Sequence, residues 1–251
     1  MVHHVTVTRP LEERPVPWPP DDTEESVLGT NLHQKTITNL RIGLNEAAHA
    51  AAGPGQPAPW FAYSQTILRG FRRRDGSRLW TLPDVFVLDH EVDERRRSLH
   101  VRRDGVPWLV IEVASDTTAD ADLDLEEGKG YVYARAGVAE YMVIDPTGEW
   151  VPEGVRAWQL QGGRYQPWTP EADGRWHSRQ IAAQIALEGA MAGVFTPRGR
   201  RMPREGEIYG ELIQRERELA QRAEELARRD AEIARLRRLL DEQQDELPPG
   251  E

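Results

Sequence analysis

Two acidic residues stand inside segments that are otherwise apolar, and they are the first candidates for chemistry. Glu112 lies in the middle of "PWLVIEVASD", and Asp84 follows Pro83 and precedes four apolar residues in "TLPDVFVL". A carboxylate buried without a partner is destabilising or stays protonated, so each acid needs a partner. If the two segments are neighbouring strands, Asp84 and Glu112 can meet at one end of a sheet and share either a proton or a cation.

A cation at this place would be Mg²⁺ or Mn²⁺, because the two acids offer oxygen ligands and the chain has no cysteine. Lys129 follows at the start of the next predicted element, and it is one of two lysines among 32 basic residues. An ammonium beside metal-bound carboxylates can orient or help deprotonate a nucleophilic water, or stabilise a phosphoryl transition state. The alternative is structural: Asp84 caps a turn, Glu112 pairs with an arginine, and Lys129 is an ordinary solvated residue.

Six elements would have to position these residues, and their order is helix, three strands, helix, strand. Apolar residues at helical spacing predict the first helix, and short apolar runs bounded by turn residues predict the strands. Several short runs separated by "QGG" and "EADG" then predict a β-meander, so the fold class is mixed α/β with a β-rich extension. The predicted core elements are a helix over 24–52, strands over 60–70, 79–89 and 107–115, a helix over 121–137 and a strand over 138–146.

The chain divides into a proline-rich extended arm over 1–23, a main domain over 24–203 and a helical tail over 204–251. In the tail one apolar column recurs every seven residues, which predicts an amphipathic helix with coiled-coil spacing and a homodimer through it. The second core position of the same heptads holds the charged residues Glu216, Asp230 and Arg237, which are unfavourable in a coiled-coil interface. A helix that packs on its own domain is therefore the alternative. The apolar column comprises Leu212, Leu219, Leu226, Ile233 and Leu240.

Composition limits the partners of the chain. The net charge of −10 argues against a protein that coats nucleic acid through bulk electrostatics, although a local basic surface is compatible with it. Two arginine-rich segments flank the Asp84 strand and either contact a phosphate backbone or are solvated turns. No 18-residue apolar window and no apolar signal segment occur, so we expect a cytoplasmic protein without a membrane span. The candidate phosphate-contacting residues are Arg72, Arg73, Arg74, Arg96 and Arg103.

Together, "PDVFVLD", "LVIEVAS" and "GKGYVYARAGVAEYMVIDP" resemble the PD-(D/E)XK nuclease superfamily. More narrowly, the chain resembles the Uma family of proposed bacterial restriction endonucleases over roughly residues 24–195. The lysine departs from the classical motif, which places it two residues after the acid, where this chain has Ala114. His33 matches a histidine in the family's first helix, and we expect it to pack or hydrogen-bond within that helix.

The resemblance implies a restriction-endonuclease-like core and Mg²⁺- or Mn²⁺-dependent cleavage of DNA. Asp84, Glu112 and the Val113 carbonyl would be metal ligands, and Lys129 would be the catalytic lysine. Asp122 or Asp124 would take the place of an aspartate that the family has between its serine and its lysine. The alternative is an inactive nuclease fold that binds nucleic acid or a protein partner, because a fold by itself does not determine activity.

Overall fold

The structure is a computed structural model that describes residues 31–93 and 95–245, with side chains described as far as Arg237. The predicted arm over residues 1–23 and the predicted helical residues 24–30 lie outside the described residues, as does the side chain of Leu240. The chain forms two compact units, one ending at Arg204 and the other beginning at Glu205. None of the described helices is long and apolar enough to cross a membrane.

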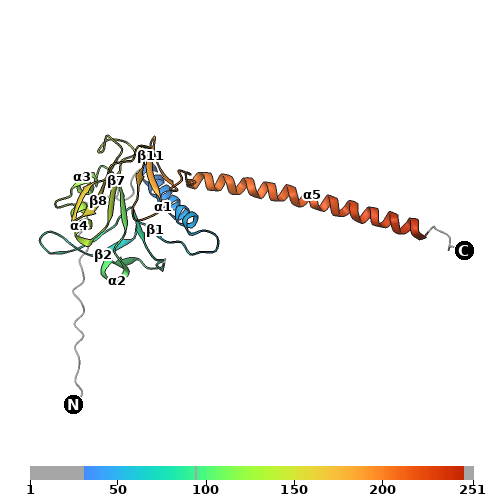
Figure 1. The fold of residues 1–251 in the computed structure, drawn as a ribbon, viewed down its shortest axis with the longest axis horizontal. Coiled ribbons are helices and arrows are strands. Elements are labelled where there is room, and N and C mark those ends of the chain that lie inside the picture. The colour runs from blue at the N-terminus through green and yellow to red at the C-terminus, as the bar shows by residue number, and fades with distance from the viewer. Residues whose placement is uncertain (1–30, 94, 246–251) are drawn as a thin grey trace, which may run out of the picture. The chain divides into compact units, whose positions relative to one another are not determined.

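A six-stranded sheet is the centre of the first unit (Figure 1). Its order is β1-β4-β6-β7-β8-β9, and all neighbours are antiparallel except β6 and β7, which run parallel. A parallel pair requires a crossover connection, and this one carries two short helices that cover one face of the sheet. The strands are β1 (Phe61–Ser64), β4 (Val85–Leu88), β6 (Leu109–Val113), β7 (Glu140–Ile144), β8 (Val155–Gln161) and β9 (Arg164–Pro167).

Two three-stranded sheets flank the large one. The first has the order β3-β2-β5 and the second β10-β11-β12. Their strands are β2 (Ile67–Arg72), β3 (Arg78–Thr81), β5 (Ser98–His100), β10 (Trp176–His177), β11 (Gln184–Glu188) and β12 (Met191–Phe195). The helices are α1 (Asn31–Ala52), α2 (Val101–Asp104), α3 (Ala119–Leu123), α4 (Lys129–Ala136) and α5 (Glu205–Asp245).

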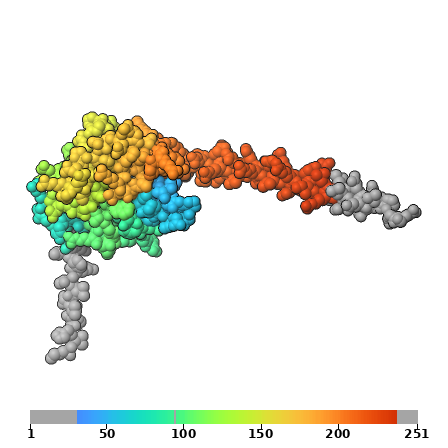
Figure 2. Space-filling model, viewed as in Figure 1, coloured from blue at the N-terminus to red at the C-terminus, as the bar shows by residue number. Residues whose placement is uncertain are grey.

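The two faces of the large sheet belong to two separate apolar clusters, because side chains alternate along each strand. Ile111 and Val113 pack with α1 and the β10–β12 sheet, whereas Val110 packs with α4 and the β2–β3–β5 sheet. The surface of α1 accordingly borders that of the late strands in the space-filling view (Figure 2). Alternation places Glu112 on the Val110 face, under the crossover.

Residues 61–88 form one long hairpin that bends from the large sheet into the small one. Two predicted single strands, 60–70 and 79–89, are therefore wrong: each is broken where the hairpin changes sheet, giving β1 and β2 on one arm and β3 and β4 on the other. Gln65 has a φ of 50°, and its N–H donates to the Pro83 carbonyl across the bend. Pro83 has no N–H to donate to a neighbouring strand, which is compatible with its place at the point where the strand is interrupted. The bend leaves Asp84 at the entrance to β4.

The crossover from β6 to β7 contains two helices where a single helix over 121–137 is predicted. Asp124 ends α3, and its Oδ1 accepts hydrogen bonds from the N–H groups of Glu126 and Glu127, which builds a turn in place of a continuous helix. The chain then packs so closely that a Cβ at Gly128 would collide with the Ala121 carbonyl. The predicted end of the second helix is confirmed, since Gly137 adopts the left-handed conformation there.

The second unit is the helix α5 of 41 residues. Ion pairs one turn apart, such as Arg228 with Glu224 and Arg229 with Glu225, line its charged faces. The large apolar side chains of the helix are exposed, among them Leu212, Leu219 and Leu226 of the heptad column. The predicted helical tail is present, and its predicted pairing with a second copy stays a prediction.

Candidate functional site

The antiparallel pairing of β4 and β6 places Asp84 and Glu112 side by side. Val85 pairs with Ile111, so the next step of the register brings Asp84 opposite Glu112. The Asp84 N–H donates to Oε2 of Glu112 at 3.3 Å, and the Val113 N–H donates to Oδ2 of Asp84 at 2.8 Å. Glu112 is fully buried, whereas the Asp84 side chain is 17% exposed and faces the edge of the site.

Lys129 reaches this pair from the first turn of α4. Its Nζ is 3.3 Å from Oε2 of Glu112 and 2.7 Å from Oδ1 of Asp122, and its side chain is only 9% exposed. The alternative that Lys129 is an ordinary solvated residue is therefore excluded. The structure also separates the two candidate aspartates: Asp122 contacts Lys129, whereas Asp124 caps the turn before α4.

Tyr133 holds the second oxygen of Glu112. It lies one turn after Lys129 on α4, and its hydroxyl donates to Oε1 of Glu112 at 2.7 Å. The crossover thus places a cation and a hydroxyl on the same carboxylate from successive turns of one helix face. Tyr133 is part of the motif of the resemblance, but sequence reasoning gave it no role.

His33 joins the site from α1, on the other side of the acids. Its Nε2 is 3.0 Å from the Val113 carbonyl oxygen and 3.5 Å from Oδ2 of Asp84. The expectation that this histidine serves only its own helix is wrong. Periodicity in α1 could not place it at the end of β6, because that contact joins residues 80 positions apart.

Three carboxyl groups and one ammonium set the electrostatics of the site. Burial raises the pKa of Glu112 to about 8, although the Lys129 ammonium opposes the shift. Burial likewise raises the pKa of Asp122. Burial disfavours the charged form of Lys129, but the charges of Asp122 and Glu112 outweigh it and raise the pKa of Lys129 above its ordinary value. The lysine therefore keeps its proton, and the excess negative charge of the site is reduced by protonation of the carboxyl groups.

Burial alone would lower the pKa of His33, but its hydrogen bond to Asp84 and the charge of that residue raise it instead. This end of the site therefore favours positive charge. Among the described residues, no three His, Asp or Glu side chains cluster closely enough to hold a metal ion by themselves. A cation would need backbone or water ligands in addition, and the Val113 carbonyl is placed to be one.

Candidate phosphate-contacting arginines already contact other residues of the chain. Arg96 and Arg103 both pair with Asp104, each in a bidentate contact. Arg74 pairs with Glu127 at 3.4 Å, and Arg72 donates to the Gly76 carbonyl at 2.7 Å. Contact of these arginines, and of Arg73, with nucleic acid stays a prediction.

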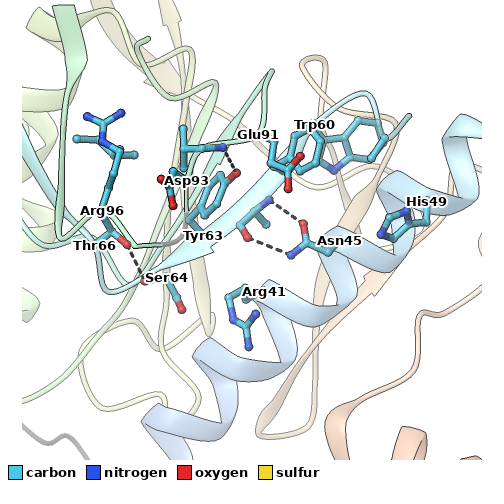
Figure 3. A pocket seen from close by; sticks show the side chains of 15 residues that line it. Arg41, Asn45, His49, Trp60, Tyr63, Ser64, Thr66, Glu91, Asp93 and Arg96 are labelled. Carbon is cyan, nitrogen blue, oxygen red and sulfur yellow. Dashed lines mark hydrogen bonds between the residues drawn. The ribbon is translucent and has the colours of Figure 1, made fainter. Parts of the chain in front are cut away.

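A pocket of about 510 Å³ lies elsewhere, along the open edge of β1 (Figure 3). The Asn45 side chain donates to the Ala62 carbonyl at 3.0 Å and accepts from the Ala62 N–H at 2.8 Å, so it replaces a neighbouring strand at that edge. Arg41 and His49 of α1 also line the pocket, but none of the buried acids does. The pocket and the acid cluster are therefore separate features.

A family model described as Uma2, "putative restriction endonuclease", matches residues 24–191. The chain belongs to this family. The predicted resemblance is confirmed, and the mixed α/β architecture of the Uma2 chain is that of a restriction-endonuclease-like fold. No curated protein matches the chain.

Membership of the Uma2 family indicates a nuclease that acts on nucleic acid. The acids, the lysine and the tyrosine all come from the segments that resemble this family, and the β6–β7 crossover gathers them. The family match does not assign roles to Asp84, Glu112 or Lys129, so these roles rest on the geometry alone.

Proposed function

We propose that this Uma2 chain is a divalent-cation-dependent endonuclease that hydrolyses phosphodiester bonds of DNA. The observation that carries the proposal is the convergence of Asp84, Glu112 and Lys129 from three elements onto one end of a sheet. Charge supports the same conclusion, since Asp84, Glu112 and Asp122 share a single ammonium. A divalent cation would balance the excess negative charge of these carboxylates. Carboxylate and carbonyl oxygens are the ligands that Mg²⁺ and Mn²⁺ accept.

In this proposal Asp84, Glu112 and the Val113 carbonyl hold the cation, which when bound lowers the pKa of a water and neutralises charge on the phosphoryl group. The Val113 N–H fixes the Asp84 carboxylate, and Tyr133 fixes Glu112 through its other oxygen. Lys129 acts by charge, because its raised pKa keeps it protonated near neutral pH. Asp122 positions the ammonium from behind, at 2.7 Å.

The second candidate is a catalytically inactive module that binds nucleic acid or a protein. It is favoured by the contacts of Glu112, since Tyr133 and Lys129 already engage both of its oxygens. In this alternative the cluster is a buried ion network that holds the crossover onto the sheet, and the fold serves recognition only.

A cleavage panel separates the two candidates. Purified protein is incubated with single-stranded, duplex and branched DNA and with RNA, in Mg²⁺, Mn²⁺ or EDTA. We expect cation-dependent cleavage of DNA that Glu112→Gln abolishes, and this nearly isosteric variant also controls for contaminating nucleases. If wild type and Glu112→Gln are equally inert on every substrate, yet wild type binds one of them, the inactive module is the correct function.

We further propose that α5 pairs with a second copy of itself. Its column of exposed leucines recurs at the heptad spacing of a coiled coil. Light scattering of the full chain should give the mass of a dimer, and Leu219→Glu with Leu226→Glu should give that of a monomer. The matched control, Gln221→Glu on the outward face of the same helix, should remain dimeric. A wild-type monomer would contradict this pairing without bearing on the nuclease site.

A further inference from the structure

Another pocket, of about 190 Å³, lies between β2, α2 and α4. Both helices pack against β2 (Figure 1). The buried side chains of Phe71 and Val132 are part of its lining, and each of the three elements adds an arginine: Arg72, Arg102 and Arg135. No acidic side chain of the described residues lines it. Three separate segments therefore bring like charges to one hollow, which favours an anion there.

A β-bulge places Arg72 at this pocket. The register between β2 and β3 shifts between Arg69 and Phe71, so Gly70, with a φ of 94°, is the extra residue of β2. A bulge redirects the side chains that follow it. Phe71 consequently lies in the core, and Arg72 is exposed beside the pocket.

His100 holds the helix that carries Arg102 against the same bulge. Its Nδ1 caps α2 by accepting a hydrogen bond from the Arg102 N–H at 3.3 Å. The ring also fills the space beside Gly70, where a Cβ would collide with it. The Arg102 backbone is therefore fixed at the pocket, although the residue is exposed.

The three guanidinium groups have donors left for a ligand, since each has five N–H donors. Arg72 uses Nη1 on the Gly76 carbonyl at 2.7 Å, and Arg135 uses Nη1 on the Tyr131 hydroxyl at 3.4 Å. The Arg135 guanidinium also lies over the Tyr131 ring, a contact of its face and not of its edge. The Arg102 side chain has no partner among the described residues, and none of the three arginines pairs with a described acid.

We propose that the arginine pocket of Arg72, Arg102 and Arg135 binds a phosphodiester group of the nucleic-acid substrate, away from the bond that is cut. The inference rests on the proposed function, because it adds a contact with the same substrate. The pocket is smaller than the roughly 300 Å³ at which sites for whole small ligands begin, and guanidinium groups match the oxygens of a phosphate. Because the chain has a net charge of −10, a local basic site is required to hold a polyanion.

The position of Arg135 agrees with a contact outside the cleavage site. Arg135 and Lys129 lie in the same helix, α4, and are about 9 Å apart along its axis, which is about three base steps of duplex DNA. One strand is therefore long enough to reach both residues. The alternative is that the three arginines are only solvated.

The salt dependence of DNA binding distinguishes the two roles. Fluorescence anisotropy of a labelled duplex is measured with the full-length protein at increasing salt, in EDTA so that no cleavage occurs. Each phosphate contact adds about 0.9 to the slope of log K against log salt concentration, so Arg102→Gln with Arg135→Gln should reduce the slope by about 1.8. The double variant should weaken binding equally on duplexes of unrelated sequence, because phosphates carry no base information.

The matched control is Arg198→Gln with Arg200→Gln, which removes the same charge from exposed residues after β12. We expect it to leave the slope unchanged. A slope equal to that of wild type in the Arg102 and Arg135 variant, or an equal reduction in the control, would overturn the arginine pocket.

Chemical protection provides a second readout that needs no variant. Phenylglyoxal modifies accessible arginines, and mass spectrometry locates the modified residues. We expect duplex DNA to protect Arg102 and Arg135, and inorganic phosphate or a nucleoside monophosphate at the same phosphate concentration to leave them reactive. Protection by the small anions alone would mean that the pocket takes a small anion, and would overturn its role in substrate binding.

The outcomes separate this inference from the function on which it rests. Cation-dependent cleavage of DNA, with no change of slope in the double variant, would overturn the arginine pocket and leave the proposed nuclease standing. A reduced slope without cleavage in any cation would support the pocket and favour the inactive module that binds nucleic acid. A wild-type protein that binds no DNA would overturn the pocket.

Discussion

Replacing Lys129 by methionine should test the buried ion cluster most directly. The substitution keeps an unbranched stem but leaves Asp122 and Glu112, both fully buried, without their ammonium. Removing one partner of a buried pair costs about 3–5 kcal/mol. The two acids can offset part of this cost by binding protons, since burial already raises the pKa of each. We therefore expect a loss of about 3 kcal/mol at pH 7.

A double-mutant cycle isolates the contact between Lys129 and Asp122. Asp122→Asn should cost less than Lys129→Met, because the ammonium retains Glu112 at 3.3 Å. The double variant should be more stable than the sum of the single changes predicts, with a coupling of about 2 kcal/mol. The assay is urea unfolding of the full chain in EDTA, extrapolated linearly to water.

An exposed pair with the same separation provides the control. Arg156 and Glu153 are also 2.7 Å apart, but their side chains are 43% and 50% exposed. Their cycle, with Arg156→Met and Glu153→Gln, should give a coupling of about 0.5 kcal/mol or less. If the Lys129 and Asp122 changes are additive to within about 0.5 kcal/mol, the account of a coupled buried cluster is wrong.

Three further predictions concern stability and association. In EDTA, stability should fall as pH rises from about 5 to 8, because the folded state binds a proton at Glu112 that the unfolded chain releases; urea midpoints should show a flatter profile for Glu112→Gln. Asp145→Asn should lower stability by about 2 kcal/mol, which thermal unfolding would measure, because this carboxylate accepts hydrogen bonds from the N–H groups of Thr147, Gly148, Trp150 and Val151. Asn45→Ala should uncover the β1 edge and increase self-association in sedimentation, whereas unchanged sedimentation would contradict the capping role.

The sequence was sufficient to predict the strand that carries Glu112 and to single out both acids, because a charge inside an apolar run is visible without coordinates. It also predicted that the helix carrying Lys129 ends at Gly137, since a left-handed cap has a glycine signature. The family match confirms the resemblance on which the predicted fold depended.

The remaining features depend on contacts that local patterns do not contain. The break at Gln65 and Pro83 is produced by two sheets that share one hairpin, so each arm alone resembles a continuous strand. The split of the predicted second helix depends on Asp124, whose acidic side chain also suits a helix start. Only the fold shows that Asp122 faces Lys129 and that His33 faces Val113.

The bend at Gln65 and Pro83 divides one hairpin between two sheets. The half next to the large sheet fixes Asp84 through its ladder with β6, whereas the far half ends in an arginine-rich turn that belongs to another sheet. Changes in the length or charge of that turn can therefore accumulate without moving the acid. Under the proposed function, the turn that would contact the substrate can change while the acid that would hold the cation stays in place.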